Sequence, residues 1–354
     1  MSTEFRELLK KVGSGKHTSK SLTRAEAAIA LDMMLDGTAT PAQIGAFLIS
    51  QRIKRPTGVE LAGMLDAYDR RSQKLDPLPN GEKVFILGIP YDGRTKTAPI
   101  APITALILKT AGVPVLMHGG DRLPTKYGLP LGEIWQALGL DFQALSFVQL
   151  QSYFQRTHFA CCYTPTLLPA SQTLISYREE LGKRPSLATL ELVWSPSGDR
   201  QAHTIAGYVH PPTEAIIRDT FTERGNPPYT LIKGLEGSGD LRISQTTIVV
   251  TNQTESADGF VYLKPNPYDY GLGGEDIHLE SPEQYYQDLA ALLQGQPSPL
   301  TDSAVWNGGF YLWHCGQVKD LQSGLDLAQT WVKTGKLQAT LTALKADLGA
   351  RIAS

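Results

Sequence analysis

The segment KVFILGIPYDGRTKTAPIAPITALILKTAGVPVLMHGGDR, residues 83–122, decides the fold. It opens with the apolar run Val84-Phe85-Ile86-Leu87, which ends in Gly88-Ile89-Pro90-Tyr91-Asp92-Gly93. A helix-compatible run over residues 103–111 follows, and a second apolar run, 113–117, opens into His118-Gly119. This order of strand, loop, helix, strand and loop predicts a doubly wound α/β domain with a mostly parallel central sheet. Ligands of such sheets bind outside the carboxyl ends of the strands, so we expect the loops 88–96 and 118–128 to face one cleft.

The first 75 residues predict a small all-helical domain. Thr23, Thr40 and Thr57 each stand three residues before a Glu or Gln, which is the capping-box pattern of a helix start. Apolar side chains recur after each start at three- and four-residue spacing, so each helix has one apolar face. The proline- and glycine-containing segment 75–81 is typical of a linker. We therefore expect a helical domain over residues 1–75 and an α/β domain with the ligand cleft over residues 82–354.

Composition narrows the class of protein. The chain has 354 residues, of which 42% are hydrophobic, and this is ample for a buried core. No apolar run approaches the length of a membrane span, and the polar N-terminus lacks a signal-peptide segment, so we expect a cytoplasmic protein with no membrane partner. Cys161, Cys162 and Cys315 lack metal-binding spacing and are interpreted as reduced core residues.

The charge distribution leaves two interpretations open. The net charge is −2, but the N-terminal stretch is cationic. Its basic residues are Arg6, Lys10, Lys11, Lys16, Lys20 and Arg24. They indicate either a solvated helix face or a surface that attracts the phosphates of a nucleic acid. The nearly neutral chain argues against strong nucleic-acid binding, because dedicated binders are usually basic overall.

The two loops and several other segments resemble the anthranilate phosphoribosyltransferases, of the nucleoside phosphorylase/phosphoribosyltransferase class. Gly88, Asp92 and Gly93 match the family's Gly-Thr-Gly-Gly-Asp-Gly loop. His118-Gly119, Lys126 and Gly128 match its Lys-His-Gly-Asn-Arg and Lys-x-Gly segments. The likeness continues in the first helices and in residues 180–184, 268–272 and 305–316. The resemblance implies that helices within 165–184 complete the helical domain and that this domain forms a homodimer.

The loop that matches the family's donor site departs from it in ways that weaken diphosphate binding. The family's donor is phosphoribosyl pyrophosphate, and a glycine-rich loop binds a diphosphate through inward-pointing amides. Pro90 has no N–H to donate, and Tyr91 fills space that the diphosphate would need. The family's Asn-Ile-Ser-Thr becomes Pro99-Ile100-Ala101-Pro102, which removes its hydroxyls. These losses argue against the family's standard reaction.

The magnesium-binding acids of the family are also replaced. Its Leu-Asp-Glu segment supplies carboxylate oxygens, which are the ligands that magnesium prefers. This region reads Glu236-Gly237-Ser238-Gly239-Asp240-Leu241-Arg242, so the adjacent acidic pair is gone. No cofactor is certain from the sequence. If the protein is active, magnesium is the expected ion, with Asp240 as its one candidate ligand.

The candidate binding residues are cations, hydroxyls and glycines of these loops. Arg184 is included because the resemblance implies that it contacts the acceptor's carboxylate, for which a planar guanidinium is well suited. No catalytic residue is assigned. The candidates for binding a phosphorylated small molecule or another anion are Gly88, Asp92, Gly93, Thr95, Lys96, Thr97, His118, Gly119, Arg122, Lys126 and Arg184.

Three functions are compatible with the sequence. The first is an anthranilate phosphoribosyltransferase-like glycosyl transferase of the tryptophan-biosynthesis type, which would act by positioning its donor and stabilising charge. The second is a non-catalytic relative that binds a nucleic acid or another polyanion. The third is a regulatory dimer that binds a small anion. The sequence leaves open which of these applies, and also whether the peptide bond before Pro90 is cis.

Overall fold

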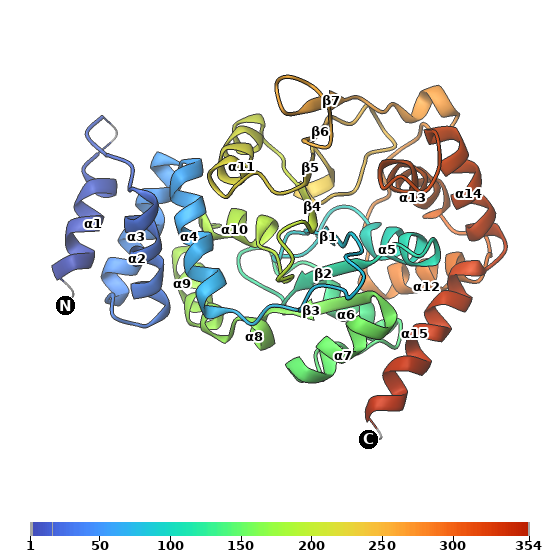
Figure 1. Ribbon diagram of the computed structural model, residues 1–354, viewed down its shortest axis with the longest axis horizontal. Helices are drawn as coiled ribbons and strands as arrows, with labels where there is room; N and C mark the ends of the chain where they lie inside the picture. Colours follow the sequence, from blue (N-terminus) through green and yellow to red (C-terminus); the bar gives the residue numbers. More distant parts are fainter. Residues whose placement is uncertain (1–2, 16, 353–354) are drawn as a thin grey trace.

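The computed structural model describes residues 3–15 and 17–352 and consists of a helical bundle beside a larger α/β lobe (Figure 1). The bundle contains α1 (Thr3–Gly13), α2 (Arg24–Leu35), α3 (Pro41–Lys54) and α4 (Gly58–Arg71). The capping boxes predicted at Thr23, Thr40 and Thr57 are all present, with bonds between each threonine and the residue three positions later. The three helix starts are therefore confirmed.

Seven strands form one sheet in the α/β lobe. They are β1 (Phe85–Leu87), β2 (Val115–Gly119), β3 (Phe159–Tyr163), β4 (His203–Gly207), β5 (Tyr229–Ile232), β6 (Val249–Thr251) and β7 (Val261–Leu263). Their spatial order is β3-β2-β1-β4-β5-β6-β7. The first five strands are mutually parallel, whereas β6 and β7 are antiparallel additions at one edge. The predicted fold class, a helical domain with a larger, mostly parallel α/β domain, is confirmed.

Helices surround the sheet and fill the end of the lobe remote from the bundle (Figure 1). The first group is α5 (Ala101–Thr110), α6 (Leu131–Ala137), α7 (Phe147–Thr157), α8 (Thr164–Leu167), α9 (Ile175–Leu181), α10 (Leu187–Val193) and α11 (Pro211–Glu223). The C-terminal group is α12 (Pro282–Leu293), α13 (Thr301–His314), α14 (Leu321–Lys333) and α15 (Lys336–Ile352). Three 3₁₀ turns are η1 (Pro169–Leu174), η2 (Leu235–Gly237) and η3 (Pro267–Tyr270).

The strand order places a topological switch point between β1 and β4. The chain proceeds from β1 through β2 to β3 in one direction, and from β4 to β5 in the other. The carboxyl ends of β1 and β4 therefore leave the sheet side by side, which is where open α/β sheets bind ligands. Gly88, just after β1, donates its N–H to the carbonyl of Ile205 at 2.7 Å. A Cβ there would lie 2.3 Å from the carbonyl oxygen of Leu192, so this close approach requires glycine.

The bundle is joined to the lobe through α4, α11 and a cluster of ion pairs. Arg24 binds Asp66 at 2.6 Å, and Arg224, which follows α11, reaches Asp66 and Asp69. α3 also contacts α9, and α2 contacts η1, so segments within 165–184 pack against the bundle. That they complete the helical domain stays a prediction. The division of the chain at residues 75–82 stays a prediction.

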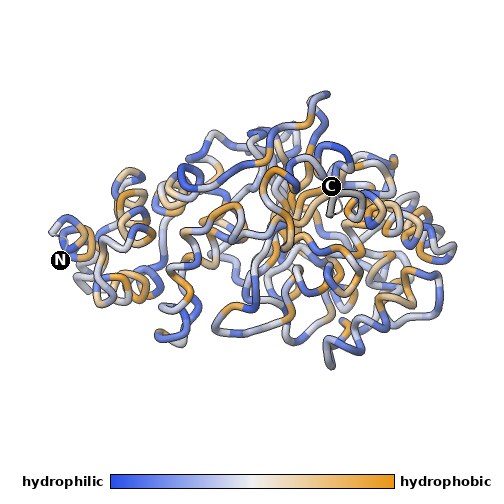
Figure 2. Tube along the Cα trace, turned by 90° about the horizontal axis from the view of Figure 1, so that it is seen from below, coloured by the Kyte–Doolittle hydropathy of each residue, from blue (hydrophilic) through white to orange (hydrophobic). Residues whose placement is uncertain are grey.

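Apolar residues gather in the centre of the lobe and recur along the helices of the bundle (Figure 2). Cys161 and Cys162 are buried in β3, Cys315 is half-buried, and all three are free thiols. Across the described ranges, no helix combines the length and the apolar character needed to cross a bilayer.

A steric test of the bundle is available at Gly63. A Cβ at this position of α4 would lie 2.0 Å from the carbonyl oxygen of Arg24. The substitution Gly63→Ala should therefore lower the free energy of unfolding by about 2 kcal/mol, because α2 and α4 must separate. The matched control is Gly45→Ala in α3, where the nearest side-chain atom, of Leu181, is 3.9 Å away. That variant should keep or gain stability, by up to about 1 kcal/mol. Urea unfolding measures both, and equal stabilities would contradict this packing.

Candidate functional site

The two loops predicted to face one cleft lie against each other. Gly128 donates its N–H to the carbonyl of Asp92 at 2.9 Å, and Arg94 and Leu129 exchange backbone bonds of 3.1 and 2.8 Å. Gly93 has φ of +74°, and a Cβ there would lie 2.4 Å from the carbonyl carbon of Gly128. The bond before Pro90 is trans. The side chains of both loops therefore begin from one rigid platform.

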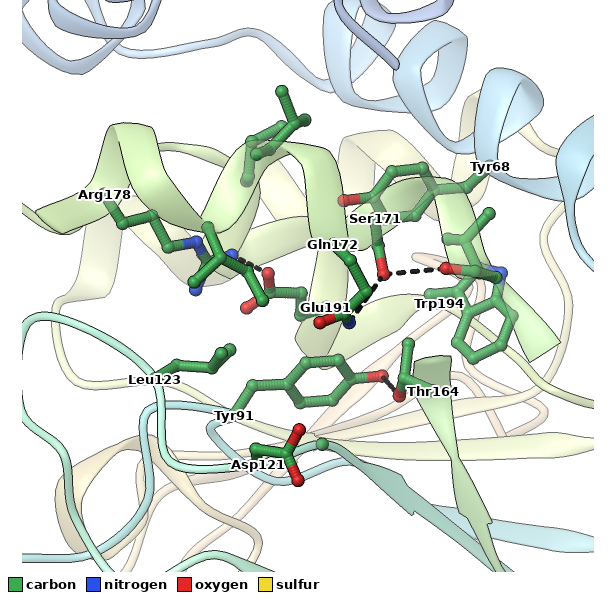
Figure 3. Close-up of a pocket in the computed structure, with 15 residues that line it drawn as sticks. Tyr68, Tyr91, Asp121, Leu123, Thr164, Ser171, Gln172, Arg178, Glu191 and Trp194 are labelled. Atoms are coloured by element: carbon green, nitrogen blue, oxygen red, sulfur yellow. Dashed lines mark hydrogen bonds and ion pairs between the residues drawn. The ribbon is translucent and has the colours of Figure 1, made fainter. Parts of the chain in front are cut away.

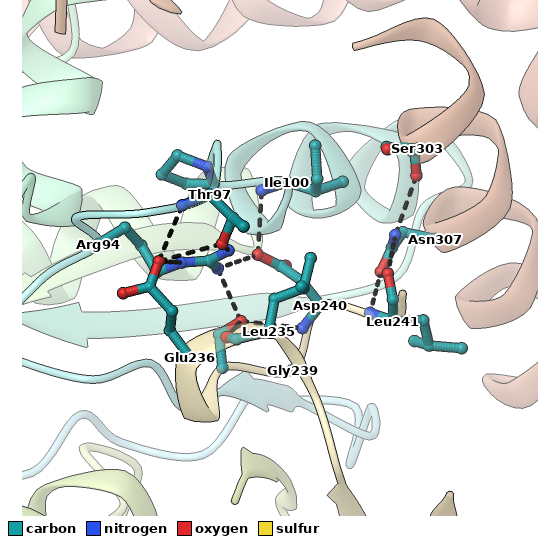
Figure 4. Close-up of polar contacts among 12 residues, drawn as sticks. Arg94, Thr97, Ile100, Leu235, Glu236, Gly239, Asp240, Leu241, Ser303 and Asn307 are labelled. Carbon is teal, nitrogen blue, oxygen red and sulfur yellow. Dashed lines mark hydrogen bonds and ion pairs between the residues drawn. The ribbon is translucent and has the colours of Figure 1, made fainter. Parts of the chain in front are cut away.

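Arg94 occupies the space at the carboxyl end of β1. Its side chain is 5% exposed, and Nη1 donates to Asp240 at 2.6 Å and to Ser238 at 2.8 Å. Its Nη2 binds the hydroxyl of Thr97, and its Nε lies 3.4 Å from Glu236 (Figure 4). The guanidinium thus ties the loop after β1 to the loop after β5. A buried charge requires this degree of pairing, because desolvation of an unpaired ion costs several kcal/mol.

Glu236 is bound by the segment predicted to hold a phosphate. The backbone N–H groups of Lys96 and Thr97 each donate to its Oε1 at 2.9 Å, and that of Thr95 donates to its Oε2 at 3.3 Å. The hydroxyls of Thr95 and Thr97 add bonds of 3.2 and 3.0 Å. Successive inward-pointing amides form an anion-binding nest.

The charge of Glu236 is stabilised strongly by this nest. Burial alone raises the pKa of a carboxyl group. The amide of Thr97, the charge of Arg94, the amide of Lys96 and the charge of Lys126 oppose that effect and lower the pKa of Glu236 to about 2. The residues predicted to bind an anion therefore already bind one, and it belongs to the protein.

Three cations and three carboxylates balance one another in the cleft. Lys126 Nζ lies 3.6 Å from Glu236 and 4.0 Å from Asp92, and Arg184 Nε lies 3.6 Å from Asp92. With the Arg94–Asp240 pair, the formal charges sum to zero. The carboxylate of Asp92 is 1% exposed, and neither of its oxygens has a hydrogen-bond partner among the described residues. Lys126, Arg184 and Asp92 are thus brought together, and an additional anion would have to compete with the protein's own acids.

Tyr91 and His118 form a buried polar pair on the other side of the loop. The Tyr91 hydroxyl is bonded to Nδ1 of His118 and accepts a bond of 3.2 Å from Thr164. Trp194 lies edge-on to the imidazole, with 5.6 Å between the ring centroids. Burial lowers the pKa of His118 to about 3, and the nearby Lys74 adds to that effect. His118 is therefore neutral at physiological pH and supplies no positive charge to the cleft.

A small hollow lies beside Tyr91 and is also lined by Tyr68 of α4 in the bundle (Figure 3). Its volume of about 30 Å³ has room for a water molecule or two. Tyr68, Tyr91 and Trp194 provide aromatic walls, and the buried ion pair of Arg178 and Glu191 lies at one side. Asp240 lines two further hollows at the carboxyl end of β1, of about 10 Å³ each, and Arg94 lines one of them.

The remaining predicted residues have other surroundings. Arg122 donates to both oxygens of Glu133, at 2.7 and 2.6 Å, and its side chain is 40% exposed. The Lys96 side chain is exposed, and Gly119 ends β2, where a Cβ would have ordinary contacts only. The structure therefore does not bring Arg122 or the charge of Lys96 to the Glu236 nest.

The basic N-terminal stretch is partly neutralised. Lys10 pairs with Glu7, Lys11 with Glu26, and Arg24 with Asp66. Lys16 lies outside the described residues. Nucleic-acid binding by this stretch stays a prediction.

The residues near Asp240 do not fit a magnesium ion. Both Arg94 and the N–H of Ile100 donate to the same oxygen of Asp240, the latter at 3.1 Å. Magnesium needs an octahedral set of oxygen ligands, and a guanidinium within bonding distance repels a cation. No group of three candidate ligands for a metal ion occurs within residues 3–15 and 17–352.

Two residues that dominate the site, Arg94 and its partner Glu236, are not among the binding residues predicted from the sequence. One signal was present, because Arg94 directly follows the matched Gly93 and Glu236 lies in the replaced acidic segment. Arg94 is a cation in one loop at the switch point and Glu236 is an anion in another, so the two side chains could form an ion pair across the cleft. Tyr91, which was expected to fill donor space, extends toward His118 and Thr164.

The buried His118 predicts a specific pH dependence of stability. Its folded pKa of about 3 lies below the unfolded value of about 6.5, so the unfolded chain takes up the proton first. The contribution of His118 is complete above pH 6.5 and is lost as the pH falls toward 3, by roughly 1 kcal/mol per pH unit. His118→Asn should flatten the fall in unfolding free energy between pH 6.5 and 4.5. The control His17→Asn, at an exposed position, should leave the slope unchanged, and an unchanged slope in both variants would contradict the burial of a neutral imidazole.

Comparison with known proteins agrees with this architecture. The helical bundle domain of a glycosyl transferase family matches residues 6–72, and the α/β domain of the same family matches residues 92–338. The anthranilate phosphoribosyltransferase of Azorhizobium caulinodans is 29% identical over 96% of this chain and 95% of its own length. That of Acetivibrio thermocellus is 27% identical over 93% of each.

Solved structures share the fold over the whole chain. The Thermus thermophilus anthranilate phosphoribosyltransferase aligns with a TM-score of 0.77 at 22% identity and covers 97% of this chain and 99% of its own. The Saccharomyces cerevisiae anthranilate phosphoribosyltransferase in complex with PRPP and Mg aligns with a TM-score of 0.80 at 16% identity and 99% coverage of both chains. Since the α/β domain match alone spans more than half of the sequence, the chain belongs to this glycosyl transferase family, as a member similar to the anthranilate phosphoribosyltransferases.

Proposed function

We propose that this protein is an anthranilate phosphoribosyltransferase-like family member that does not carry out the magnesium-dependent transfer from phosphoribosyl pyrophosphate. Its cleft instead binds a small phosphorylated molecule or another small anion weakly. Of the three functions that the sequence leaves open, this is nearest to the third, and it retains the family's fold and ligand class without its standard reaction.

The position of Arg94 carries the proposal. Its guanidinium is bonded to Asp240 at 2.6 Å and fills the carboxyl end of β1. The one acid expected to hold magnesium is thus neutralised by a buried cation, and releasing it would leave that cation with only the longer contact of 3.4 Å to Glu236 as an ion pair. Breaking a buried pair in this way costs several kcal/mol. The protein's own side chain therefore holds Asp240 in place of a metal ion.

The loop after β1 supports the same conclusion. Pro90 has no N–H to donate to a diphosphate, and the Tyr91 side chain is buried with its hydroxyl bonded to His118 and Thr164. The hollows at the end of β1 have volumes of about 10 Å³ each. Pockets for small-molecule ligands usually measure roughly 300 Å³ or more. Phosphoribosyl pyrophosphate could therefore enter these hollows only if side chains that line them moved away.

One titration tests the proposal. Calorimetry of the wild-type protein with phosphoribosyl pyrophosphate, with and without magnesium, should show no binding tighter than about millimolar, which is roughly −4 kcal/mol. The Saccharomyces cerevisiae relative, whose structure contains PRPP and Mg, serves as the reference under identical conditions. Micromolar binding that depends on magnesium would overturn the proposal and restore the transferase function.

We further propose a cytoplasmic homodimer formed through the helical bundle. Ile53 at the end of α3 is 73% exposed and Ile29 on α2 is 38% exposed, so the bundle presents apolar side chains that a second copy would cover.

A matched pair of variants tests the dimer. Ile53→Asp should shift the solution mass from dimer toward monomer, because a carboxylate at the contact would lose its hydration. Val148→Asp is the control, since Val148 is 74% exposed on α7 in the α/β lobe. Sedimentation equilibrium gives both masses, and a wild-type monomer, or equal effects of the two substitutions, would exclude this contact.

A further inference from the structure

We propose that the segment 95–97 is an oxyanion-binding site that the protein keeps occupied with its own Glu236, so that a phosphate group enters only when this carboxylate leaves. The inference rests on the proposed function in one respect, namely that the ligand is an anion. It adds the exact place of binding and the group that competes for it.

The geometry of the nest is that of a site for a tetrahedral oxyanion. Three consecutive backbone amides, from Thr95 to Thr97, point at one carboxylate, and both threonine hydroxyls bind it as well. Lys126 closes one side with its ammonium group 3.6 Å from the carboxylate. Amides, hydroxyls and an ammonium group are the donors that bind phosphate and sulfate in proteins. The carboxylate of Glu236 satisfies them with two oxygens, whereas a phosphate offers three or four.

Glu236 is placed so that it can leave the nest. Its side chain is 11% exposed, so it borders solvent, unlike Asp240, which is 2% exposed. The residue has φ of +51° within η2, a conformation that L residues adopt at a small cost. The rest of this loop is anchored separately by Asn307 of α13. Its side chain accepts a bond of 2.7 Å from the N–H of Leu241 and donates one of 3.1 Å to the carbonyl of Leu241 (Figure 4). A rotation of the Glu236 side chain can therefore open the nest while the loop stays in place.

Charge balance explains why the wild-type protein should bind phosphate weakly. With Glu236 in the nest, the cleft's three cations are matched by three carboxylates. Phosphate must displace the Glu236 carboxylate. Its apparent dissociation constant is therefore the intrinsic constant divided by the fraction of molecules in which Glu236 has left the nest. Removing the Glu236 carboxylate leaves one positive charge of the cleft unbalanced beside the free amides of residues 95–97. A phosphate ion can then bind these amides without competing with Glu236.

The experiment compares Glu236→Ala with the wild type and with a matched control. Glu133→Ala also removes a carboxylate paired with an arginine, Arg122, but no backbone amide binds that carboxylate in the described structure. Inorganic phosphate is titrated into each protein, and binding is followed by thermal unfolding and by ³¹P line broadening. Phosphate should bind Glu236→Ala at least about tenfold more tightly than it binds the wild type, and should raise its melting temperature more than it raises those of the other two proteins. Sodium chloride at equal ionic strength should not reproduce the shift.

Two further variants make the result decisive. Lys126→Met in the Glu236→Ala background should remove most of the gain in phosphate binding, whereas Lys319→Met, at an exposed position just before α14, should not. If Glu236→Ala does not fold without phosphate, recovery of the fold in phosphate supports the site. If it does not fold even then, Glu236→Gln, which keeps the acceptor and loses the charge, is titrated in its place and should show a smaller gain.

Equal phosphate binding by wild-type, Glu133→Ala and folded Glu236 variants would overturn the inference. This outcome is independent of the titration with phosphoribosyl pyrophosphate. Magnesium-dependent binding of that donor by the wild type would refute the proposed function and still leave the gain in Glu236→Ala to be measured.

Discussion

The ion pair between Arg94 and Asp240 is the interaction on which the cleft depends. It joins the first loop of the α/β lobe to the loop after β5 across the switch point of the sheet. The same guanidinium holds Ser238 and Thr97, so the walls of the cleft share one buried cation. In a low-dielectric interior, such a cation fixes the positions of its acceptors, because each lost bond leaves a desolvated charge. The cleft is consequently an ionic network in which Arg94, Lys126 and the amides of residues 95–97 already face the protein's own carboxylates.

Much of the fold could be predicted from the sequence, and the exceptions have physical causes. The capping boxes at Thr23, Thr40 and Thr57 are local, so they were visible without tertiary context. β1 and the first three residues of β2 are uninterrupted apolar runs, as expected for strands buried on both faces. β4 was missed because it begins with His203 and Thr204. The His203 side chain is nevertheless buried, and the hydroxyl of Thr230, on the neighbouring strand, bonds its Nε2 at 2.8 Å.

The position of the site in the fold could be predicted from the sequence, but the ion pairs and the charge of the groups that fill it could not. The order of strands indicated where the loops would meet, and the glycines at positions 88 and 93 indicated a tight backbone there. The anion in the nest comes from a residue 140 positions after Lys96, and no local pattern reveals a pairing over that separation. The low pKa of His118 has a similar origin, since it follows from burial of the imidazole by Tyr91, Trp194 and other residues that are remote in the chain.

The ion pairs between the helical bundle and α11 have a consequence for how ligands reach the cleft. Arg224 binds two acids of α4, and a Cβ added at Gly58 of that helix would lie 2.5 Å from Cβ of Asp219 in α11. Backbones that approach so closely, with charges shared between them, resist hinge motion, because separation would expose several paired ions at once. Bundle and lobe should therefore diffuse and tumble as one rigid body. Exchange between cleft and solvent would then occur through rotamer changes at its rim, on the nanosecond timescale of side chains rather than the slower timescale of domain closure.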